Sequence, residues 1–324
     1  MQILALESAT THVSASLLRY LPETDPSTGP SADAGLAPAP ASESASGAST
    51  GPASAHRRDP AAGSSTQVWQ RAADLPRAAS ESLLELVDGV LADAGITLSE
   101  VDLLATSVGP GMFTGVRIAI ATLQGLALAR GCPVVGVDTL ATVALGAARA
   151  FAPSENGLEV AVLMDARRDE VYTAAYRFPP GENTGGHLCE STSGQPEYAL
   201  DLAARLVPVA SPALSQPGRA WATIAHALGH SQAHTQADTQ ANKPAQATSQ
   251  HDASRLPRIA VGSGIGLYPG LEPAALSDAG ASLVCATCHP EAENVALLAA
   301  VLALSGKTLA MTDLEPLYLR PAVD

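Results

Sequence analysis

The spacing of apolar residues along the chain predicts strands that alternate with helices. Short apolar runs bounded by polar or glycine-rich turns predict strands at residues 2–6, 13–18, 68–72, 101–108, 134–137, 160–164, 171–176 and 259–261. Apolar residues on a helical repeat predict helices at residues 76–95, from the turn at 109–117 to about 130, at 139–150 and at 294–305. Several strands precede the first helix and a partial second round follows. The pattern therefore predicts a mixed α/β fold built from two related lobes.

Two segments with few large apolar side chains are predicted to be disordered insertions. Residues 22–66 consist mainly of Pro, Ala, Ser, Gly and Thr, and about residues 225–256 are rich in Gln, Ala, His and Thr. Such compositions bury too little apolar surface to offset the entropy of ordering the chain. We assign residues 1–108 to a first lobe and residues 109–324 to a second, and expect the helix at 294–305 to pack back on the first lobe.

The charge balance argues against a protein that binds nucleic acid on its own. The chain has 18 Lys and Arg against 32 Asp and Glu, a net charge of −14, whereas binding through counterion release needs a basic face. Its 4 cysteines do not suggest a disulfide scaffold. No apolar run is long enough for a membrane helix, and the N-terminal run lacks the basic residues of a signal peptide. We expect a cytoplasmic protein that does not enter a membrane.

A glycine-rich turn at residues 109–117 joins a predicted strand to a predicted helix. Three glycines and a threonine at such a point can form a nest of backbone N–H groups that holds an anion. The same residues suit tight packing of the strand against the helix, with the threonine as N-cap. The pattern alone favours packing, because glycine-rich strand-to-helix turns are common. The candidate residues of this turn are Gly109, Gly111, Phe113, Thr114, Gly115 and Arg117.

A charged turn follows the predicted strand at 160–164. Its candidate residues are Asp165, Arg167, Arg168 and Glu170. Alternating charge of this kind usually marks a solvated, salt-bridged loop. Arginine side chains can also recognise carboxylate or phosphate groups, so a docking edge is the alternative. The residues alone favour the solvated loop.

Histidine and cysteine patterns elsewhere in the chain are better explained by composition than by chemistry. His226, His230 and His234 lie four residues apart but fall in the Gln-rich and Thr-rich segment. Cys285 and Cys288, followed by His289, match a haem-attachment pattern without an export signal, and no second CxxC completes a zinc site. A redox role for the two cysteines stays open. We assign no catalytic and no metal-binding residue.

The predicted order of elements resembles the ribonuclease-H-like unit of the actin and sugar-kinase superfamily. In that superfamily the turn between the first two strands reads Asp-x-Gly-Thr/Ser, and a second phosphate turn contains Asp-Gly-Gly. Here the first turn is Glu-Ser-Ala-Thr-Thr at 7–11, where the Cβ of Ala9 fills space that a phosphate needs. The second is Asp-Ala-Arg-Arg at 165–168. Both differences predict an actin-like fold that has lost a phosphoryl-transfer site.

Six segments taken together closely resemble the TsaB (YeaZ) family, whose members are dimerisation subunits of the bacterial machinery that makes N6-threonylcarbamoyladenosine (t6A) in tRNA. GPGxFTGVR followed by DARRxEVY is the most specific part of this resemblance. The match extends over the chain apart from the two insertions. The segments are residues 3–18, 109–129, 134–144, 165–176, 261–269 and 315–321.

The resemblance implies a non-catalytic subunit that binds and activates TsaD, with no activity alone and no cofactor of its own. TsaD transfers threonylcarbamoyl to the adenosine next to the anticodon of tRNAs that read codons beginning with adenine, and the ATPase TsaE joins the pair. The charge of −14 suggests that tRNA is contacted mainly through TsaD. A homodimer in the absence of TsaD, and ATP or ADP at the interface with TsaD, stay open.

The resemblance places the TsaD interface on the helices at 78–94 and 114–130. The candidate interface residues are Leu83, Val87, Leu91 and Ile120. Ordinary core packing is the alternative, and the sequence does not separate the two. The alternative function is an independent enzyme of the same superfamily, either ATP-dependent and kinase-like or glycoprotease-like. The helix at 76–95 contains no histidine, whereas TsaD carries a metal-binding His-x-x-x-His on the corresponding helix.

Overall fold

The structure is a computed structural model that describes most of the 324 residues. The described residues are 1–20, 56–58, 66–74, 79–151, 153–154, 156–180, 196–236, 256–286 and 288–320. Most of the predicted insertion at 22–66 lies outside these residues, as do residues 237–255 of the second one. Within the first insertion the short strand β3 (His56–Arg58) pairs with β4 (Thr66–Asp74), which the sequence did not predict.

The first sheet contains six strands in the order β3-β4-β2-β1-β5-β6. Its other strands are β1 (Gln2–Glu7), β2 (His12–Tyr20), β5 (Leu103–Gly109) and β6 (Val134–Asp138). β1 and β2 form an antiparallel hairpin, and β2 pairs antiparallel with β4. β5 then lies parallel to β1, and β6 parallel to β5. The sheet therefore changes from antiparallel to parallel at β1.

The second sheet repeats this arrangement in the order β11-β10-β7-β8-β9. Its strands are β7 (Leu158–Arg167), β8 (Glu170–Phe178), β9 (Val207–Ser215), β10 (Arg258–Val261) and β11 (Leu283–Cys285). β7, β8 and β9 are antiparallel neighbours, whereas β10 is parallel to β7 and β11 parallel to β10. The two sheets share one topology, which confirms the predicted actin-like fold of two related lobes.

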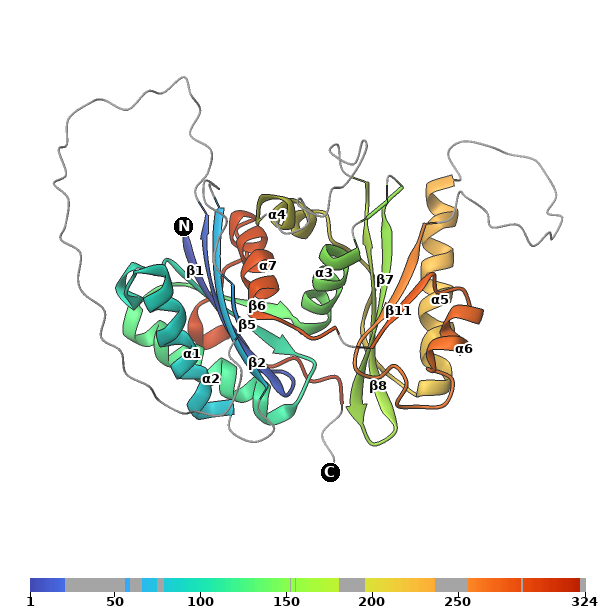
Figure 1. Ribbon diagram of the computed structural model, residues 1–324, viewed down its shortest axis with the longest axis horizontal. Helices are drawn as coiled ribbons and strands as arrows, with labels where there is room; N and C mark the ends of the chain where they lie inside the picture. Colours follow the sequence, from blue (N-terminus) through green and yellow to red (C-terminus); the bar gives the residue numbers. More distant parts are fainter. Residues whose placement is uncertain are drawn as a thin grey trace, which may run out of the picture.

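Helices cover both faces of each sheet (Figure 1). α1 (Ala79–Ala94) and α2 (Phe113–Arg130) pack on the outer face of the first sheet. α3 (Thr139–Phe151), α4 (Pro196–Ala204) and α7 (Ala292–Leu304) lie between the sheets, while α5 (Pro217–Gln236) and α6 (Pro273–Asp278) cover the outer face of the second. Single-turn 3₁₀ helices occur at Leu98–Glu100 and Met311–Asp313.

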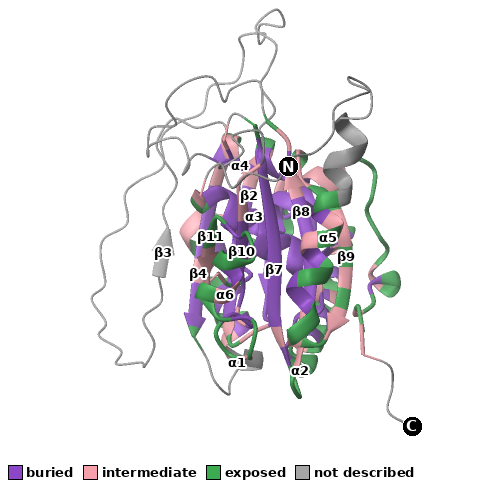
Figure 2. Cartoon of the chain, turned by 90° about the vertical axis from the view of Figure 1, so that its right-hand side faces the viewer, coloured by how far each residue is buried: buried purple, intermediate pink, exposed green. Residues whose placement is uncertain are grey.

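The largest apolar core lies between the two sheets and is built around α3 and α7. α7 is buried from Ala292 to Ala300 and packs on β1 and β2 of the first sheet. A buried ion pair joins the two helices: Arg149 donates to Glu293 at 2.5 Å and to the Asn294 side chain at 2.7 Å. In Figure 2 β7 and β8 are largely buried, whereas α5 and α6 carry exposed residues on their outer sides.

The chain crosses between the two sheets later than predicted. The sequence placed the lobe boundary between residues 108 and 109, but α2 and β6 follow that point and still belong to the first sheet. Two parallel strands need a crossover connection, and α2 is the crossover from β5 to β6. The chain reaches the second sheet only through α3, at Leu158.

The second predicted insertion begins too early. Helix α5 continues to Gln236, whereas the sequence placed disorder from about residue 225. Leu228 is fully buried in the core under the second sheet, together with Ile224. The buried side chains of Ile224 and Leu228 therefore hold this helix against the second sheet, although the surrounding segment is polar in composition. In the part of the chain that the structure describes, no helix is long and apolar enough to cross a membrane.

Candidate functional site

The glycine-rich turn packs tightly against the turn that follows β1. A Cβ added at Gly115 would lie 1.9 Å from the carbonyl oxygen of Ser8, and one added at Gly111 would lie 2.6 Å from the Cβ of Ala9. The Ser8 hydroxyl donates to the Gly115 carbonyl at 2.7 Å, and the Met112 N–H donates to the Ala9 carbonyl at 2.7 Å. These contacts support the packing interpretation at both glycines, because only glycine permits so close an approach.

The start of α2 differs from the prediction. The N-cap is Met112, which makes no side-chain capping bond, and Thr114 is an exposed residue inside the first turn. The expectation of Thr114 as N-cap was wrong because the contacts of the neighbouring glycines fix where the chain enters the helix. Gly109 has a φ of 109°, and a Cβ there would lie 2.9 Å from the carbonyl oxygen of Leu317. Glycine is required at that position by both conformation and space.

A buried carboxyl group lies at the end of β1. Glu7 is fully buried, and its Oε1 accepts a hydrogen bond from the Ala9 N–H at 2.6 Å. Its Oε2 and the nearby Ser107 hydroxyl are buried without a hydrogen-bond partner of ordinary geometry among the described residues. Burial raises the pKa of Glu7 to about 7, although Ser107, the Ala9 N–H and His12 act in the opposite direction.

The charged turn between β7 and β8 is more tightly bonded than a solvated loop. The Asp165 carboxylate accepts from the Tyr268 hydroxyl at 2.7 Å and from the Arg167 N–H at 2.8 Å. The hydrogen bond to Asp165 is the main reason that the pKa of Tyr268 rises to about 12. Asp165 also pairs with the Arg167 guanidinium at 3.2 Å, although that guanidinium is largely exposed.

The remainder of this turn faces the C-terminal segment. Glu170 forms an ion pair at 2.5 Å with Arg320, which also donates to the Ala166 carbonyl at 3.1 Å. Arg168 is exposed, and it makes no ion pair with a carboxylate of the described residues. The turn is tight: φ lies between 55° and 62° at Arg167, Arg168 and Asp169, which is the left-handed conformation.

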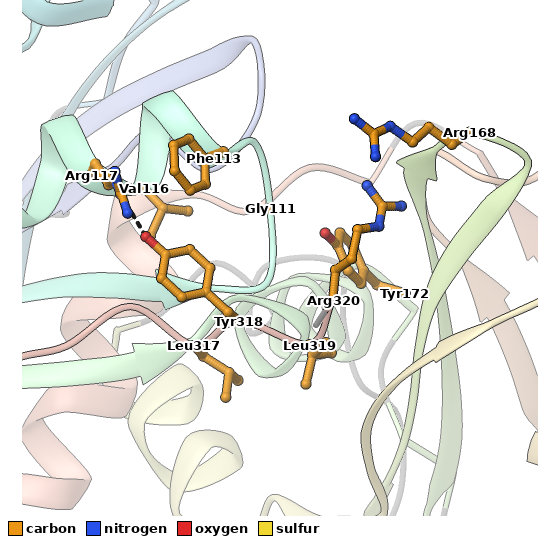
Figure 3. A pocket seen from close by; sticks show the side chains of 10 residues that line it. All are labelled: Gly111, Phe113, Val116, Arg117, Arg168, Tyr172, Leu317, Tyr318, Leu319 and Arg320. Carbon is orange, nitrogen blue, oxygen red and sulfur yellow. Dashed lines mark hydrogen bonds between the residues drawn. The ribbon is translucent and has the colours of Figure 1, made fainter. Parts of the chain in front are cut away.

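A cavity of about 480 Å³ lies between these two turns and the C-terminal segment. Figure 3 shows Arg117, Phe113 and Tyr318 on one side of it and Arg168, Arg320 and Tyr172 on the other. The Arg117 guanidinium lies 3.9 Å from the centre of the Phe113 ring, and its Nε donates to the Tyr318 hydroxyl at 2.6 Å. The structure thus brings the glycine-rich turn and the charged turn to one cavity.

A second cavity, of about 250 Å³, lies where the turn after β1 meets the turn after β7. Residues 9–11 line one side and residues 164–167 the other, with Ser263 and His289 beside them. These are the two turns that the sequence identified as equivalents of phosphate turns, and the structure places them opposite each other. A Cβ added at Gly111 would lie 2.6 Å from the Cβ of Ala9, so the glycine-rich turn packs against the first turn at this edge of the cavity.

The candidate interface residues are buried inside the first lobe. Leu83, Val87, Leu91 and Ile120 have relative exposures of 0%, 2%, 8% and 5%, in the core between the first sheet and helices α1 and α2. This burial agrees with the alternative interpretation, in which these residues pack in the core of the lobe. The exposed large apolar residues of the same helices are Leu84, Leu128 and Phe113, of which the sequence singled out only Phe113.

The other sequence candidates are histidines and cysteines. Among the described residues, no group of three His, Cys, Asp or Glu side chains is placed to hold a metal ion. His226 is exposed on α5, and the side chains of His230 and His234 lie outside the described residues. Cys285 and Cys288 lie with their Sγ atoms 3.3 Å apart as thiols, and burial raises the pKa of Cys288 to about 12.

Several residues that line the cavities were not singled out from the sequence. Tyr172, Tyr318 and Arg320 line the larger cavity, and Ser263 lines the smaller. All four lie within segments that carried the family resemblance, but no local motif marks them as binding residues. Arg117 and Tyr318 are separated by 201 positions, so only the fold reveals their contact.

Comparison with known proteins identifies relatives of this chain and of its fold. A family model described as TsaD, tRNA N6-adenosine threonylcarbamoyltransferase, matches residues 73–210. A curated TsaB from Escherichia coli, named a tRNA threonylcarbamoyladenosine biosynthesis protein, is 44% identical over 103 residues, 32% of this chain and 42% of the relative. The resemblance to TsaB is confirmed. A TsaB from Haemophilus influenzae is 40% identical over 96 residues, 30% of this chain and 39% of the relative.

These sequence alignments span less than half the length of each TsaB relative. The solved structure titled YeaZ from Pseudomonas aeruginosa extends the likeness of fold to the whole chain. It covers 98% of this chain and 99% of its own, with a TM-score of 0.57 and 24% identity. At that identity the match concerns the fold, which agrees with the two related lobes described above.

Proposed function

We propose that this chain is a non-catalytic subunit that binds and activates a TsaD partner in the biosynthesis of t6A in tRNA. The observation that carries the proposal is an apolar face of α2 that is exposed in the described chain. The names of the curated TsaB relatives and of the matching TsaD family model support the pathway. The partner and the activating role rest on the argument that follows.

The exposed face of α2 is made of small and apolar side chains. Ala121, Gly125, Leu128 and Ala129 are exposed and lie three or four residues apart, so they share one side of the helix. A Cβ added at Gly125 would meet nothing within 4 Å. Leu128 is 72% exposed, and Leu84 on the neighbouring α1 is 48% exposed.

This face is suited to a second helix pair. Small residues allow the axes of packed helices to approach closely, and the exposed leucines supply apolar area to bury. The buried residues of the same helices hold α1 and α2 rigidly on the first sheet. A rigid, exposed apolar helix face is typical of a protein–protein interface. The same face can join two copies of this chain when TsaD is absent.

The turn chemistry supports a subunit without phosphoryl-transfer activity. Ala9 stands where the superfamily has glycine, and its Cβ occupies the turn that would hold a phosphate. The second turn carries Ala166 and Arg167 where the superfamily has glycines. In this proposal TsaD carries out the transfer to tRNAs that read codons beginning with adenine, TsaE joins the complex, and the acidic chain contacts tRNA mainly through TsaD.

The test uses light scattering coupled to size-exclusion chromatography, with this protein alone and mixed with TsaD from the same organism. A threonylcarbamoylation assay on tRNA then measures each fraction, with TsaE and ATP present. We expect a complex that is active while this chain alone is inert. Turnover by this chain alone would instead support the independent kinase-like or glycoprotease-like enzyme.

A pair of matched variants locates the interface. Leu128→Lys places a charge on the α2 face, while Leu304→Lys makes the same change at the end of α7, where the leucine is 63% exposed. Both are surface changes with little expected effect on folding. Leu128→Lys should weaken the complex at least tenfold, because a buried unpaired charge is costly. Equal affinity of the two variants for TsaD would remove the α2 face from the proposal.

A further inference from the structure

The cavity of about 480 Å³ between the lobes has the properties of a small-molecule site. Such sites usually have volumes of roughly 300–1,000 Å³ and combine apolar walls with a few polar groups. Here Val116, Leu317 and Leu319 contribute aliphatic walls, and Phe113, Tyr172 and Tyr318 contribute rings. The proposed function uses the outer face of α2 and assigns nothing to this cavity.

Two arginines at the cavity have no carboxylate partner among the described residues. Arg117 and Arg168 make no ion pair there, whereas Arg320 is paired with Glu170. Arg19, Arg130 and Arg219 also make no ion pair among the described residues, but of these five arginines only Arg117 and Arg168 line the cavity. Both therefore keep their guanidinium charge available to a ligand.

Arg117 is held in position by aromatic side chains rather than by an acid. Its guanidinium lies over the Phe113 ring at 3.9 Å and 5.6 Å from the centre of the Tyr318 ring. Its Nε donates to the Tyr318 hydroxyl, and its two terminal nitrogens have no acceptor among the described residues. Phe113 and Tyr318 are themselves stacked, with ring centres 5.6 Å apart. Aromatic contacts orient a cation without neutralising it.

The exposed rings of Phe113 and Tyr318 indicate that a ligand of this cavity contains a planar group. Phe113 is 57% exposed and Tyr318 is 48% exposed, although both are large apolar side chains. A planar group that stacks on either ring would bury this surface, and offset stacking of rings is favourable. A bare ion would leave the rings uncovered.

We propose that this cavity binds a small organic phosphate or carboxylate that carries a planar ring, with Arg117 and Arg168 recognising the anion and the rings of Phe113 and Tyr318 contacting the planar group. Arginine suits this role because its planar fork donates two parallel hydrogen bonds to phosphate or carboxylate. The two lobes contribute one arginine each, so the ligand contacts both lobes at once.

The first test measures binding of three probes to the full chain by isothermal titration calorimetry. Phenyl phosphate has both features, inorganic phosphate has only the anion, and phenol has only the ring. We expect phenyl phosphate to bind at least tenfold more tightly than either of the others. Equal affinities of phenyl phosphate and inorganic phosphate would overturn the role of the rings, and absence of phenyl phosphate binding would overturn the site.

Variants then identify the residues. Arg168→Gln should weaken phenyl phosphate binding about tenfold, since charge-assisted hydrogen bonds are the strong ones, and Arg168→Lys should restore part of the loss. Arg219→Gln is the control, because Arg219 is an exposed arginine on α5, outside the cavity. A loss with Arg219→Gln as large as with Arg168→Gln would show that only general charge attracts the probe, which would overturn the proposal.

The aromatic wall is tested at Tyr318. Tyr318→Phe keeps the ring and removes the hydroxyl that accepts from Arg117, whereas Tyr318→Ser removes both. Phenyl phosphate should bind the Phe variant more tightly than the Ser variant, and inorganic phosphate should not distinguish them. Equal binding of phenyl phosphate to the two variants would contradict ring stacking. These measurements use the chain without TsaD, so their outcome is independent of the proposed complex.

Discussion

The buried carboxyl of Glu7 makes stability depend on pH in a defined direction. Burial raises its pKa from 4.5 to about 7, so the folded chain holds this proton more tightly than the unfolded chain does. The contribution of Glu7 is therefore most favourable below pH 4.5 and is lost as pH rises through 7. The difference of about 2.5 pKa units corresponds to roughly 3 kcal/mol at about 1.4 kcal/mol per unit.

The perturbation that isolates this effect is Glu7→Gln, which keeps the shape and cannot ionise. We expect the free energy of unfolding of Glu7→Gln, minus that of the natural chain, to increase by roughly 3 kcal/mol between pH values below 4.5 and above 7. Urea unfolding at a series of pH values measures it, because other titrating groups are common to both chains and cancel. Glu85→Gln, at an exposed position on α1, is the control.

A difference that stays constant with pH would refute the reasoning, because it would mean that Glu7 ionises as easily in the folded chain as in the unfolded one. A difference with the opposite slope would place a cation close to Glu7 in the folded chain. The Glu85→Gln control should give a flat difference. If it also varies by several kcal/mol, the effect belongs to net charge and not to burial.

Three further substitutions and one double variant test how the turns and helices are packed. Gly115→Ala should destabilise the fold by roughly 1–3 kcal/mol, because its Cβ would lie 1.9 Å from the Ser8 carbonyl oxygen. Gly125→Ala, where a Cβ meets nothing, should instead stabilise by about 1 kcal/mol, and thermal unfolding compares the two. Arg149→Met should cost about 3 kcal/mol or more in urea unfolding, because it leaves the charge of Glu293 buried without its arginine. Adding Glu293→Gln should recover much of that loss, and a double variant no more stable than Arg149→Met would contradict the ion-pair account.

The periodicity of apolar residues predicted the elements that have a regular apolar pattern. It missed elements whose residue composition is unusual for a strand or a helix. Apart from β3 and the 3₁₀ helix at Leu98–Glu100, the order of strands and helices up to β8 was predicted, because each of the other elements has a continuous apolar run or a helical repeat. β9 was missed because its sequence, VPVASPALS, contains Pro208 and Pro212, which count against a strand. The structure shows β9 at the edge of its sheet, where proline is tolerated because one side needs no hydrogen bonds.

The candidate site was predicted only in part. The glycine-rich and charged turns were found from local composition, and both line the larger cavity. The role of Leu83 and Ile120 was left open because a helical apolar pattern does not say which side faces a partner. The contact of Arg117 with Tyr318 joins distant parts of the chain, and no local pattern predicts such a contact.

The shared topology of the two sheets explains why the smaller cavity lies between their hairpin turns. The β1–β2 hairpin of the first sheet corresponds to the β7–β8 hairpin of the second, since each is followed by an antiparallel third strand and by two parallel strands. The turns of these hairpins are therefore equivalent, and they face one another across the smaller cavity. Their side chains differ in character: Ala9 packs against Gly111 at one turn, while Arg168 extends a charge from the other turn to the larger cavity. Because Ala9 fills the first turn and the second turn carries a cation, recognition of an anion at the larger cavity fits these turns better than transfer of a phosphoryl group between two glycine turns.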